Sequence, residues 1–337
     1  MGEIPQRVRP TTPALATFAQ ARYVREGPAD RDCGHGIFGG PMRTASCRWF
    51  ARALLVFGFV AASAHAQVVV VVEGDLARAS IELADDQGVV YSADATIQFD
   101  TPLNLAPQTL NLTASLVDPL DPALAARLPA GLVVDPAFPV LVTVEPPVVS
   151  WLFRSGFDGG PLPIESLSFR NAYRIEIHTH DLVYTPGSPY RLLKAPLGGA
   201  FADVTEDVLP GSTRARGRGG AFSEFIVAAD SRAPLLVALD KLVALDARLL
   251  AAVLGDTLRL DLVALLAQVH VAVLVPIVGC GNALLPLDDF LGEIAAHAGV
   301  DIANLWRAER DLANDAGELE SLAWTLRFSL LGCAGTP

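Results

Sequence analysis

Residues 174–180 read Arg-Ile-Glu-Ile-His-Thr-His, and this stretch decides how the middle of the chain folds. Ile175 and Ile177 alternate with polar residues, so they point to one side of an extended strand. The side chains on the opposite side are those of Arg174, Glu176, His178 and His180. Such strict alternation predicts a half-buried strand over residues 173–184, in an antiparallel sheet that has one polar face.

Similar runs on both sides of this stretch extend the β-rich region. They are rich in Val, Ile, Thr, Leu and Phe, and Gly, Asn, Asp-Pro or Pro-Pro separate them. The predicted strands cover residues 68–73, 79–83, 89–91, 96–99, 109–116, 132–134, 140–144, 166–169, 190–193 and 222–228. We therefore predict an antiparallel β-sandwich-like region over residues 67–230, in which the Gly- and Pro-rich segment 151–163 is a candidate junction. A single helical turn is predicted at 122–128.

The composition changes at Ser231, where a helical pattern begins. Leu235, Leu242 and Leu249 recur every seven residues, which predicts an amphipathic helix with Pro234 in its first turn. Further helices are predicted at 257–274, 287–298, 302–313 and 317–330. The helix at 257–274 is apolar on nearly every side, so we expect it to be central. The fold class is therefore α+β, with a bundle-like helical region over residues 231–337 after the β-rich region.

An export signal precedes the β-rich region. Met42 opens a segment that contains three arginines, followed by an apolar run over 53–64 and by Ala64-His65-Ala66. This order predicts a secretory signal peptide over 42–66, cleaved after Ala66. Because the apolar run continues to Val72, a signal anchor is the alternative. We expect residues 1–41 to be a disordered, mis-assigned extension, the mature protein to be periplasmic or extracellular, and no membrane anchor to remain after cleavage.

Export changes the meaning of the four cysteines. Cys33 and Cys47 lie in segments that cleavage removes, whereas Cys280 and Cys333 remain. An even number of cysteines in an oxidising compartment predicts a disulfide between these two, and two free buried thiols are the alternative. The bridge would close a loop of about 53 residues, worth about 4 kcal/mol in the chain-entropy model.

The first candidate site is the polar side of the strand at 173–184. His178 and His180 lie two residues apart on one strand face, close enough to share a divalent metal ion. Zinc hydrolases use three such ligands, so Glu176, His270 or His297 would have to supply the third. This hypothesis is a metal-dependent hydrolase. The alternative is an exposed polar strand face without a metal.

The second candidate site is the arginine-rich segment 211–220. Arg214, Arg216 and Arg218 alternate along it, and guanidinium groups suit carboxylate or phosphate. The functional interpretation is a site for an anion or an acidic glycan. In the alternative, the segment is a glycine-rich hairpin whose arginines pair with nearby acids such as Asp203, Glu206, Asp207 or Glu224.

Charge and motifs restrict the function further. The formal net charge is −12, which disfavours binding to nucleic acids. The sequence contains no G-x-S-x-G, H-E-x-x-H, P-loop or G-x-G-x-x-G motif. We therefore expect a non-enzymatic exported protein, without a resident cofactor, that binds an envelope protein or a glycan. The apolar segment 257–274 supports another alternative, a carrier of an apolar ligand held between sheet and helices.

Three blocks of sequence resemble an uncharacterised family of secreted bacterial proteins. They are HTHDLVYTPGSPYRLLKAPLGGAFADVT at 178–205, GSTRARGRGGAFSEF at 211–225, and WRAERDLANDAG with WTLRFSL within 306–330. The resemblance implies export and a shared order of strands followed by helices. It implies no activity, and no site residues carry over from it.

Overall fold

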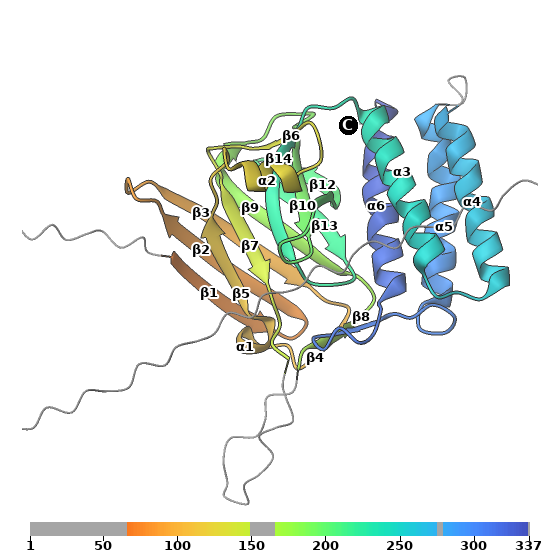
Figure 1. The fold of residues 1–337 in the computed structure, drawn as a ribbon, viewed down its shortest axis with the longest axis horizontal. Coiled ribbons are helices and arrows are strands. Elements are labelled where there is room, and N and C mark those ends of the chain that lie inside the picture. Colours follow the sequence, from red (N-terminus) through yellow and green to blue (C-terminus); the bar gives the residue numbers. More distant parts are fainter. Residues whose placement is uncertain (1–65, 149–165, 275–278, 336–337) are drawn as a thin grey trace, which may run out of the picture. The chain divides into compact units, whose positions relative to one another are not determined.

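The computed structural model describes residues 66–148, 166–274 and 279–335 (Figure 1). Residues 60–337 belong to one compact unit. Residues 1–41, the candidate junction at 151–163 and all of the predicted signal peptide except Ala66 lie outside the described residues. The described part is a mixed α/β protein, with extensive antiparallel sheets in its N-terminal and central parts and long helices after them.

The first sheet contains the alternating segment from which the fold was predicted. Its six antiparallel strands lie in the order β1-β2-β3-β9-β13-β12. Their bounds are β1 Ala66–Glu73, β2 Leu76–Ala84, β3 Val90–Gln98, β9 Tyr173–Val183, β13 Ser212–Gly219 and β12 Thr205–Leu209. Ile175 and Ile177 are each 1% exposed, and the side chains between them lie on the other, more exposed face, as the alternation predicts. One strand, β3, replaces the two short strands predicted at 89–91 and 96–99.

The second sheet also has six strands, and a small third sheet joins distant segments. The second sheet has the order β11-β10-β14-β7-β5, with β6 paired to β14. Its bounds are β11 Ala202–Asp203, β10 Tyr190–Ala195, β14 Glu224–Asp230, β7 Val140–Val144, β5 Leu112–Leu116 and β6 Leu132–Val134. The third sheet is β15 Leu305–Arg307, β8 Ser168–Arg170 and β4 Thr101–Leu103. The segment predicted as one strand at 109–116 is instead the short helix α1 (Pro107–Leu110) followed by β5.

Two hydrophobic clusters cover the faces of the second sheet. Its inner face packs with the inner face of the first sheet, where Val142 and Phe225 join Ile81 and Ile177 in one core. Its other face is covered by Leu124 of helix α2 (Pro122–Arg127), the helical turn expected at 122–128. The Asp121 carboxylate caps α2 by accepting a hydrogen bond from the Ala123 N–H at 2.8 Å. The two sheets therefore share a core that involves only the inner face of the first sheet.

The prediction of a helix at 302–313 is wrong. Leu305–Arg307 forms strand β15, and Trp306 is 4% exposed and stacks on Phe169 with 5.1 Å between ring centroids. Tyr173 and Phe222 belong to the same aromatic cluster. Tertiary packing can override the helix propensity of a segment. At Trp306, burial of the large indole ring outweighs the helical pattern of the surrounding sequence.

Four long helices follow the strands. They are α3 Pro234–Ala251, α4 Asp256–Leu274, α5 Leu284–His297 and α6 Asp315–Cys333, with a short 3₁₀ turn, η2, at Cys280–Ala283. They share a core of their own around Leu242, Leu262 and Leu326. Pro234 is the first residue of α3, as expected, and Ala233 occupies the capping position.

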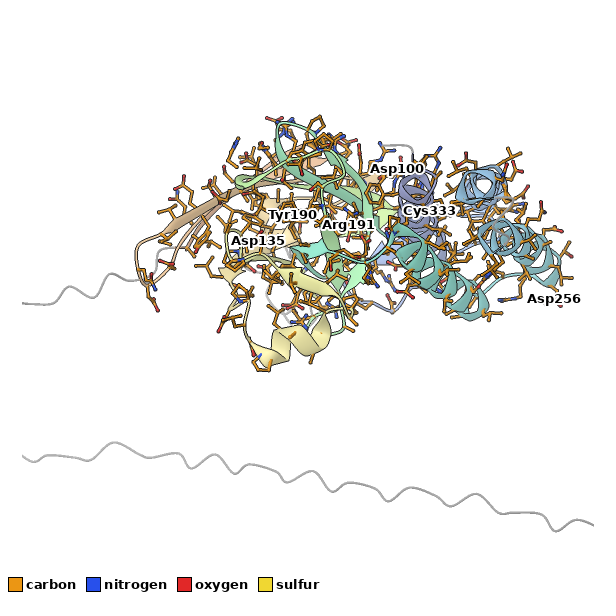
Figure 2. All side chains as sticks on the ribbon, turned by 90° about the horizontal axis from the view of Figure 1, so that it is seen from above. Asp100, Asp135, Tyr190, Arg191, Asp256 and Cys333 are labelled. Atoms are coloured by element: carbon orange, nitrogen blue, oxygen red, sulfur yellow. A yellow bond between two sulfur atoms is a disulfide. The ribbon has the colours of Figure 1, made fainter. Side chains whose placement is uncertain are left out.

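Helix α4 does not occupy the central position predicted for it. Leu260 and Val271 are 68% and 61% exposed, and Figure 2 shows Asp256, at the start of α4, at the edge of the helices away from the sheets. Only one side of α4, which includes Leu262 and Leu266, enters the helical core. Among the described residues α4 is the helix that is long and apolar enough to cross a membrane, by length and composition alone.

Helix α6 connects the helices to the first sheet through close backbone contact. A Cβ atom on Gly220 would lie 2.6 Å from the Glu318 backbone nitrogen and 2.8 Å from the Gly317 carbonyl carbon. The Gly220 N–H also donates a hydrogen bond to the Glu318 carboxylate at 3.0 Å. The chain can therefore approach the first turn of α6 only because residue 220 lacks a side chain.

We expect Gly220→Ala to lower the free energy of unfolding by about 1–3 kcal/mol, because the added methyl group must push α6 away from the sheet. Gly292→Ala, in helix α5, is the matched control. A Cβ there meets nothing within 4 Å, and alanine favours the helix by up to about 1 kcal/mol. Urea denaturation of the two variants measures both effects. Equal stability of the two would contradict the close approach.

The two lysines of the chain both join helices to strands. Lys194 of β10 lies 3.0 Å from the Glu318 carboxylate of α6. Lys241 of α3 is 6% exposed, and its ammonium lies 2.6 Å from the Asp203 carboxylate of β11. These pairs place charge at the boundary between helices and sheets, where an uncompensated group would be costly.

Cys280 and Cys333 are joined as a disulfide, with 5.8 Å between their Cα atoms. The bridge connects the turn that precedes α5 to the last residue of α6. Gly279, with φ of +76°, introduces this turn in a conformation that favours glycine.

Candidate functional site

The outer face of the first sheet brings both candidate sites together. The register places side chains of β3, β9 and β13 in three rows across the strands. The rows are Gln98-Arg174-Arg218, Thr96-Glu176-Arg216 and Asp94-His178-Arg214. The residues that the sequence assigned to a metal site and to an anion site are therefore direct neighbours on one surface, which we call the polar face.

The three ligands of the proposed metal site do not come together. The rings of His178 and His180 are adjacent, with 4.6 Å between centroids, but the Glu176 carboxylate forms an ion pair with Arg216. His270 contacts Asp246 at 2.5 Å, and His297 contacts Asp301 at 2.6 Å. Within residues 66–148, 166–274 and 279–335, no three His, Cys, Asp or Glu side chains are grouped to hold a metal ion. The metal centre at His178 and His180 therefore stays a prediction.

The three arginines of the second candidate site have different surroundings. Arg218 is 6% exposed and holds Glu206 with two nitrogens, at 2.8 and 2.9 Å. Arg216 pairs with Glu176. For Arg214 the described residues supply no hydrogen-bond or ion-pair partner, and its Nε atom is buried. Pairing with local acids was the alternative interpretation, and it describes Arg216 and Arg218 but not Arg214.

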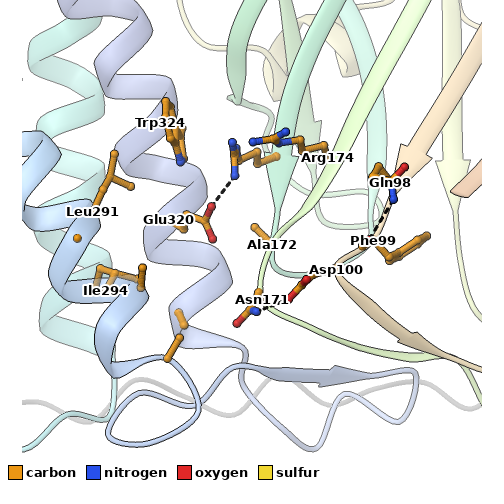
Figure 3. Close-up of a pocket in the computed structure, with 15 residues that line it drawn as sticks. Gln98, Phe99, Asp100, Asn171, Ala172, Arg174, Leu291, Ile294, Glu320 and Trp324 are labelled. Atoms are coloured by element: carbon orange, nitrogen blue, oxygen red, sulfur yellow. Dashed lines mark hydrogen bonds and ion pairs between the residues drawn. The ribbon is translucent and has the colours of Figure 1, made fainter. Parts of the chain in front are cut away.

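A cleft lies where the polar face meets helices α5 and α6 (Figure 3). Its volume is about 570 Å³. The sheet supplies polar side chains and the helices supply mainly apolar ones. The lining includes Gln98, Asp100, Asn171 and Arg174 from the sheet side and Leu291, Ile294 and Glu320 from the helices. In Figure 3, Arg174 and Glu320 point into the cleft from opposite walls.

In one wall of the cleft, the charged side chains of Arg218 and Glu320 are paired with each other. The Arg218 guanidinium donates to the Glu320 carboxylate at 2.5 Å and lies over the Trp324 ring, 4.6 Å from its centroid. Burial raises the pKa of Glu320 above its ordinary value, and the nearby Arg218 opposes this shift. Arg218 is therefore a structural tie between β12, β13 and α6 rather than a group available to a ligand.

Arg174 is the available cation of the cleft. It is exposed, and among the described residues its guanidinium has no hydrogen-bond or ion-pair partner. The Asp100 carboxylate beside it already accepts a hydrogen bond from Asn171 at 2.5 Å. Arg174 and Gln98 also line a second, smaller hollow of about 370 Å³ farther along the polar face. Arg174 can therefore reach a ligand in either hollow.

Sequence reasoning did not identify this cleft. The alternation placed Arg174 on the polar side of its strand, but nothing nearby in sequence shows that Glu320 and Leu291 lie opposite. These residues are more than 100 positions away. The arginine-rich spacing pointed to Arg218, which the structure shows to be neutralised.

Another cavity, of about 640 Å³, lies between the strands and helices α3 and α6. Arg191, Asp230 and Arg232 line it, and Arg232 holds Asp230 with contacts of 2.7 to 3.2 Å. Burial lowers the pKa of Arg191 from its ordinary value, and Asp203 and Asp230 oppose this shift. The charges of this cavity largely compensate one another.

The fold is that of a mixed α/β protein in which a polar sheet face and two helices border a cleft. The chain belongs to DUF6689, a family of unknown function, whose match covers residues 53–334. No curated protein and no solved structure matches the chain.

Proposed function

We propose that this is an exported, non-enzymatic binding protein that holds an acidic saccharide in the cleft between the polar face and helices α5 and α6. The observation that carries the proposal is the Arg174 guanidinium, which faces the cleft without a partner among the described residues. Guanidinium groups bind carboxylates and sulfates with two parallel hydrogen bonds. The proposed location is the periplasm or the extracellular medium, and the proposed scaffold is the sandwich-like β region.

The two walls of the cleft favour a saccharide. Gln98 presents an amide oxygen, and Asp100 a second carboxylate oxygen beside the one that Asn171 holds, and such acceptors suit hydroxyls. Leu291 and Ile294 of α5 present an apolar surface that suits the C–H face of a sugar ring. A volume of about 570 Å³ lies within the usual range for small-molecule sites. A carrier of a fully apolar ligand would leave Arg174 buried against hydrocarbon, at considerable cost.

The cleft supports binding more than hydrolysis. Glycoside hydrolysis needs two carboxyl groups that flank the scissile bond. Of the two carboxyl groups that line the cleft, Asp100 is held by Asn171 and Glu320 by Arg218. The envelope glycan is thus proposed as a ligand rather than a substrate.

The test is isothermal titration calorimetry with acidic oligosaccharides and with neutral oligosaccharides of the same backbone. We expect binding of the acidic series only, and a loss of about 10- to 100-fold in affinity for Arg174→Ala, the range for a charge-assisted hydrogen bond. Arg78→Ala is the matched control, because Arg78 is an exposed strand arginine that pairs with Glu73 at the β1–β2 hairpin. Equal binding of the two series, or unchanged affinity in Arg174→Ala, would overturn the proposal.

A further inference from the structure

We propose that Arg214, His178, His180 and Ser212 form an oxyanion site on the polar face, separate from the cleft, that binds sulfate or a sulfate ester more tightly as the pH falls. The ligand class is a tetrahedral oxyanion, either free or as an ester group. This site does not depend on the function proposed for the cleft, since Arg174 has no part in it.

The sheet register brings the four side chains together. Arg214 is directly opposite His178 on adjacent strands, at a separation where cross-strand side chains touch. The rings of His178 and His180 lie 4.6 Å apart. The register of β13 against β9 shifts between Ser212 and Thr213, and the Ser212 hydroxyl contacts the His178 Nε2 atom. The bulge therefore adds a hydroxyl to a cluster of three nitrogen-bearing side chains.

Arg214 is the observation that points to a ligand. Its Nε atom is buried and has no hydrogen-bond partner among the described residues. Buried polar atoms in proteins nearly always have partners, so an unsatisfied guanidinium nitrogen calls for an explanation. The neighbouring Arg216 and Arg218 are each paired with an acid on this face. No acid among the described residues forms such a pair with Arg214. An oxyanion at the guanidinium would give this side chain the partner that the described residues do not supply.

The carboxylates around the cluster of Arg214, His178 and His180 already interact with other groups. Glu176 is paired with Arg216, and the Asp181 carboxylate accepts a hydrogen bond from the Ser92 N–H at 3.2 Å. Asp94 accepts a hydrogen bond from Ser80 at 2.9 Å and lies 3.8 Å from the His178 Nδ1 atom. Asp94 is thus the acid nearest to the imidazoles, and it is not close enough to neutralise the arginine.

The electrostatics predict the direction of the pH dependence. Burial lowers the pKa of His178 below its ordinary value, and Arg214 and His180 lower it further, while Asp94 and Glu176 oppose them. A bound oxyanion favours the charged imidazolium and therefore raises this pKa. By linkage, binding takes up a proton and becomes tighter as the pH falls through the histidine range.

Sulfate is the appropriate probe, because its charge is constant over this range. Isothermal titration calorimetry at pH 7.5 and pH 5.0 should show saturable binding that is about tenfold tighter at pH 5.0, equivalent to about one linked unit of pKa. Arg214→Ala should lose at least tenfold at both pH values. His178→Gln with His180→Gln should retain weak binding but lose its pH dependence.

The control is Glu176→Gln with Arg216→Ala, which removes a mutually neutralised pair one row away and should leave the sulfate affinity within twofold. A sulfated monosaccharide that binds as tightly as sulfate would assign the site to esters, and much weaker binding would assign it to the free ion. Undisturbed binding in Arg214→Ala, a pH dependence that survives in the double histidine variant, or the absence of saturable binding at pH 5.0 would each overturn the proposal. Circular dichroism of each variant verifies that it is folded.

Discussion

Replacing Lys241 with methionine is expected to lower the free energy of unfolding by about 3–5 kcal/mol, the usual cost of removing one partner of a buried ion pair. The Lys241 ammonium lies 2.6 Å from Asp203 and donates a hydrogen bond to the Thr325 carbonyl at 3.1 Å. Burial lowers the pKa of Lys241, and Asp203 opposes this shift. Without the ammonium, the Asp203 carboxylate in the boundary between α3, α6 and β11 loses the cation that contacts it.

Urea denaturation of three variants tests this result. Lys241→Met and Asp203→Asn should each be strongly destabilised, whereas the double variant should recover a large part of the loss, because neither charge is then left alone. Lys194→Met is the control. It removes the other lysine, whose partner Glu318 is 28% exposed and stays hydrated, so the loss should be smaller. A single Lys241→Met variant within 1 kcal/mol of wild type would refute the role assigned to this pair.

Loss of the disulfide is expected to have the second-largest effect, about 4 kcal/mol in the chain-entropy model for a separation of 53 residues. Cys280→Ser, Cys333→Ser and the double variant should all have a similar, lower melting temperature. Removal of the last five residues, which include Cys333, should have the same effect. Reductant should lower the melting temperature of the wild type but not of the variants.

Mass mapping without reduction provides the direct test of the bridge. The peptides that contain Cys280 and Cys333 should be recovered joined. Recovery of both cysteines alkylated before any reduction would show that the thiols are free, and the variants would then be expected to lose much less stability.

The strands were predictable where their residues alternate. Ile175 and Ile177 have polar neighbours that fix which side of β9 is buried, and β6 and β7 have the predicted bounds of 132–134 and 140–144. The short strand β15 was not predictable, because its partner is distant in the sequence. Trp306 pairs its backbone with Phe169, and a window of sequence around Trp306 contains no trace of that partner.

The position of α4 was wrongly predicted for a related reason. Apolar composition shows that a helix can be buried. How much of its surface is buried depends on the arrangement of the neighbouring elements. Leu262 and Leu266 face the other helices, whereas Leu260 and Val271 remain exposed. The start of α3, marked by the local signal of Pro234, and both ends of α4 were predicted within a few residues.

The candidate site was predictable residue by residue but not as an assembly. The sequence singled out His178 and Arg214 separately, as a metal ligand and as an anion ligand. Their direct pairing depends on the register of β9 and β13, which are more than 30 residues apart in the chain. Register is set by the packing of whole strands, so the union of the two sites appears only in three dimensions.

The placement of the two lysines has a practical consequence for chemical probing. The side chains of Lys194 and Lys241 are 11% and 6% exposed, and both lie where helices meet strands. Amine-directed labels and lysine-specific proteases therefore find no exposed lysine on the folded protein. Reaction at these two lysines, as distinct from reaction at the α-amino group, reports the separation of α3 and α6 from the sheets. A lysine-specific protease therefore detects opening at this internal boundary.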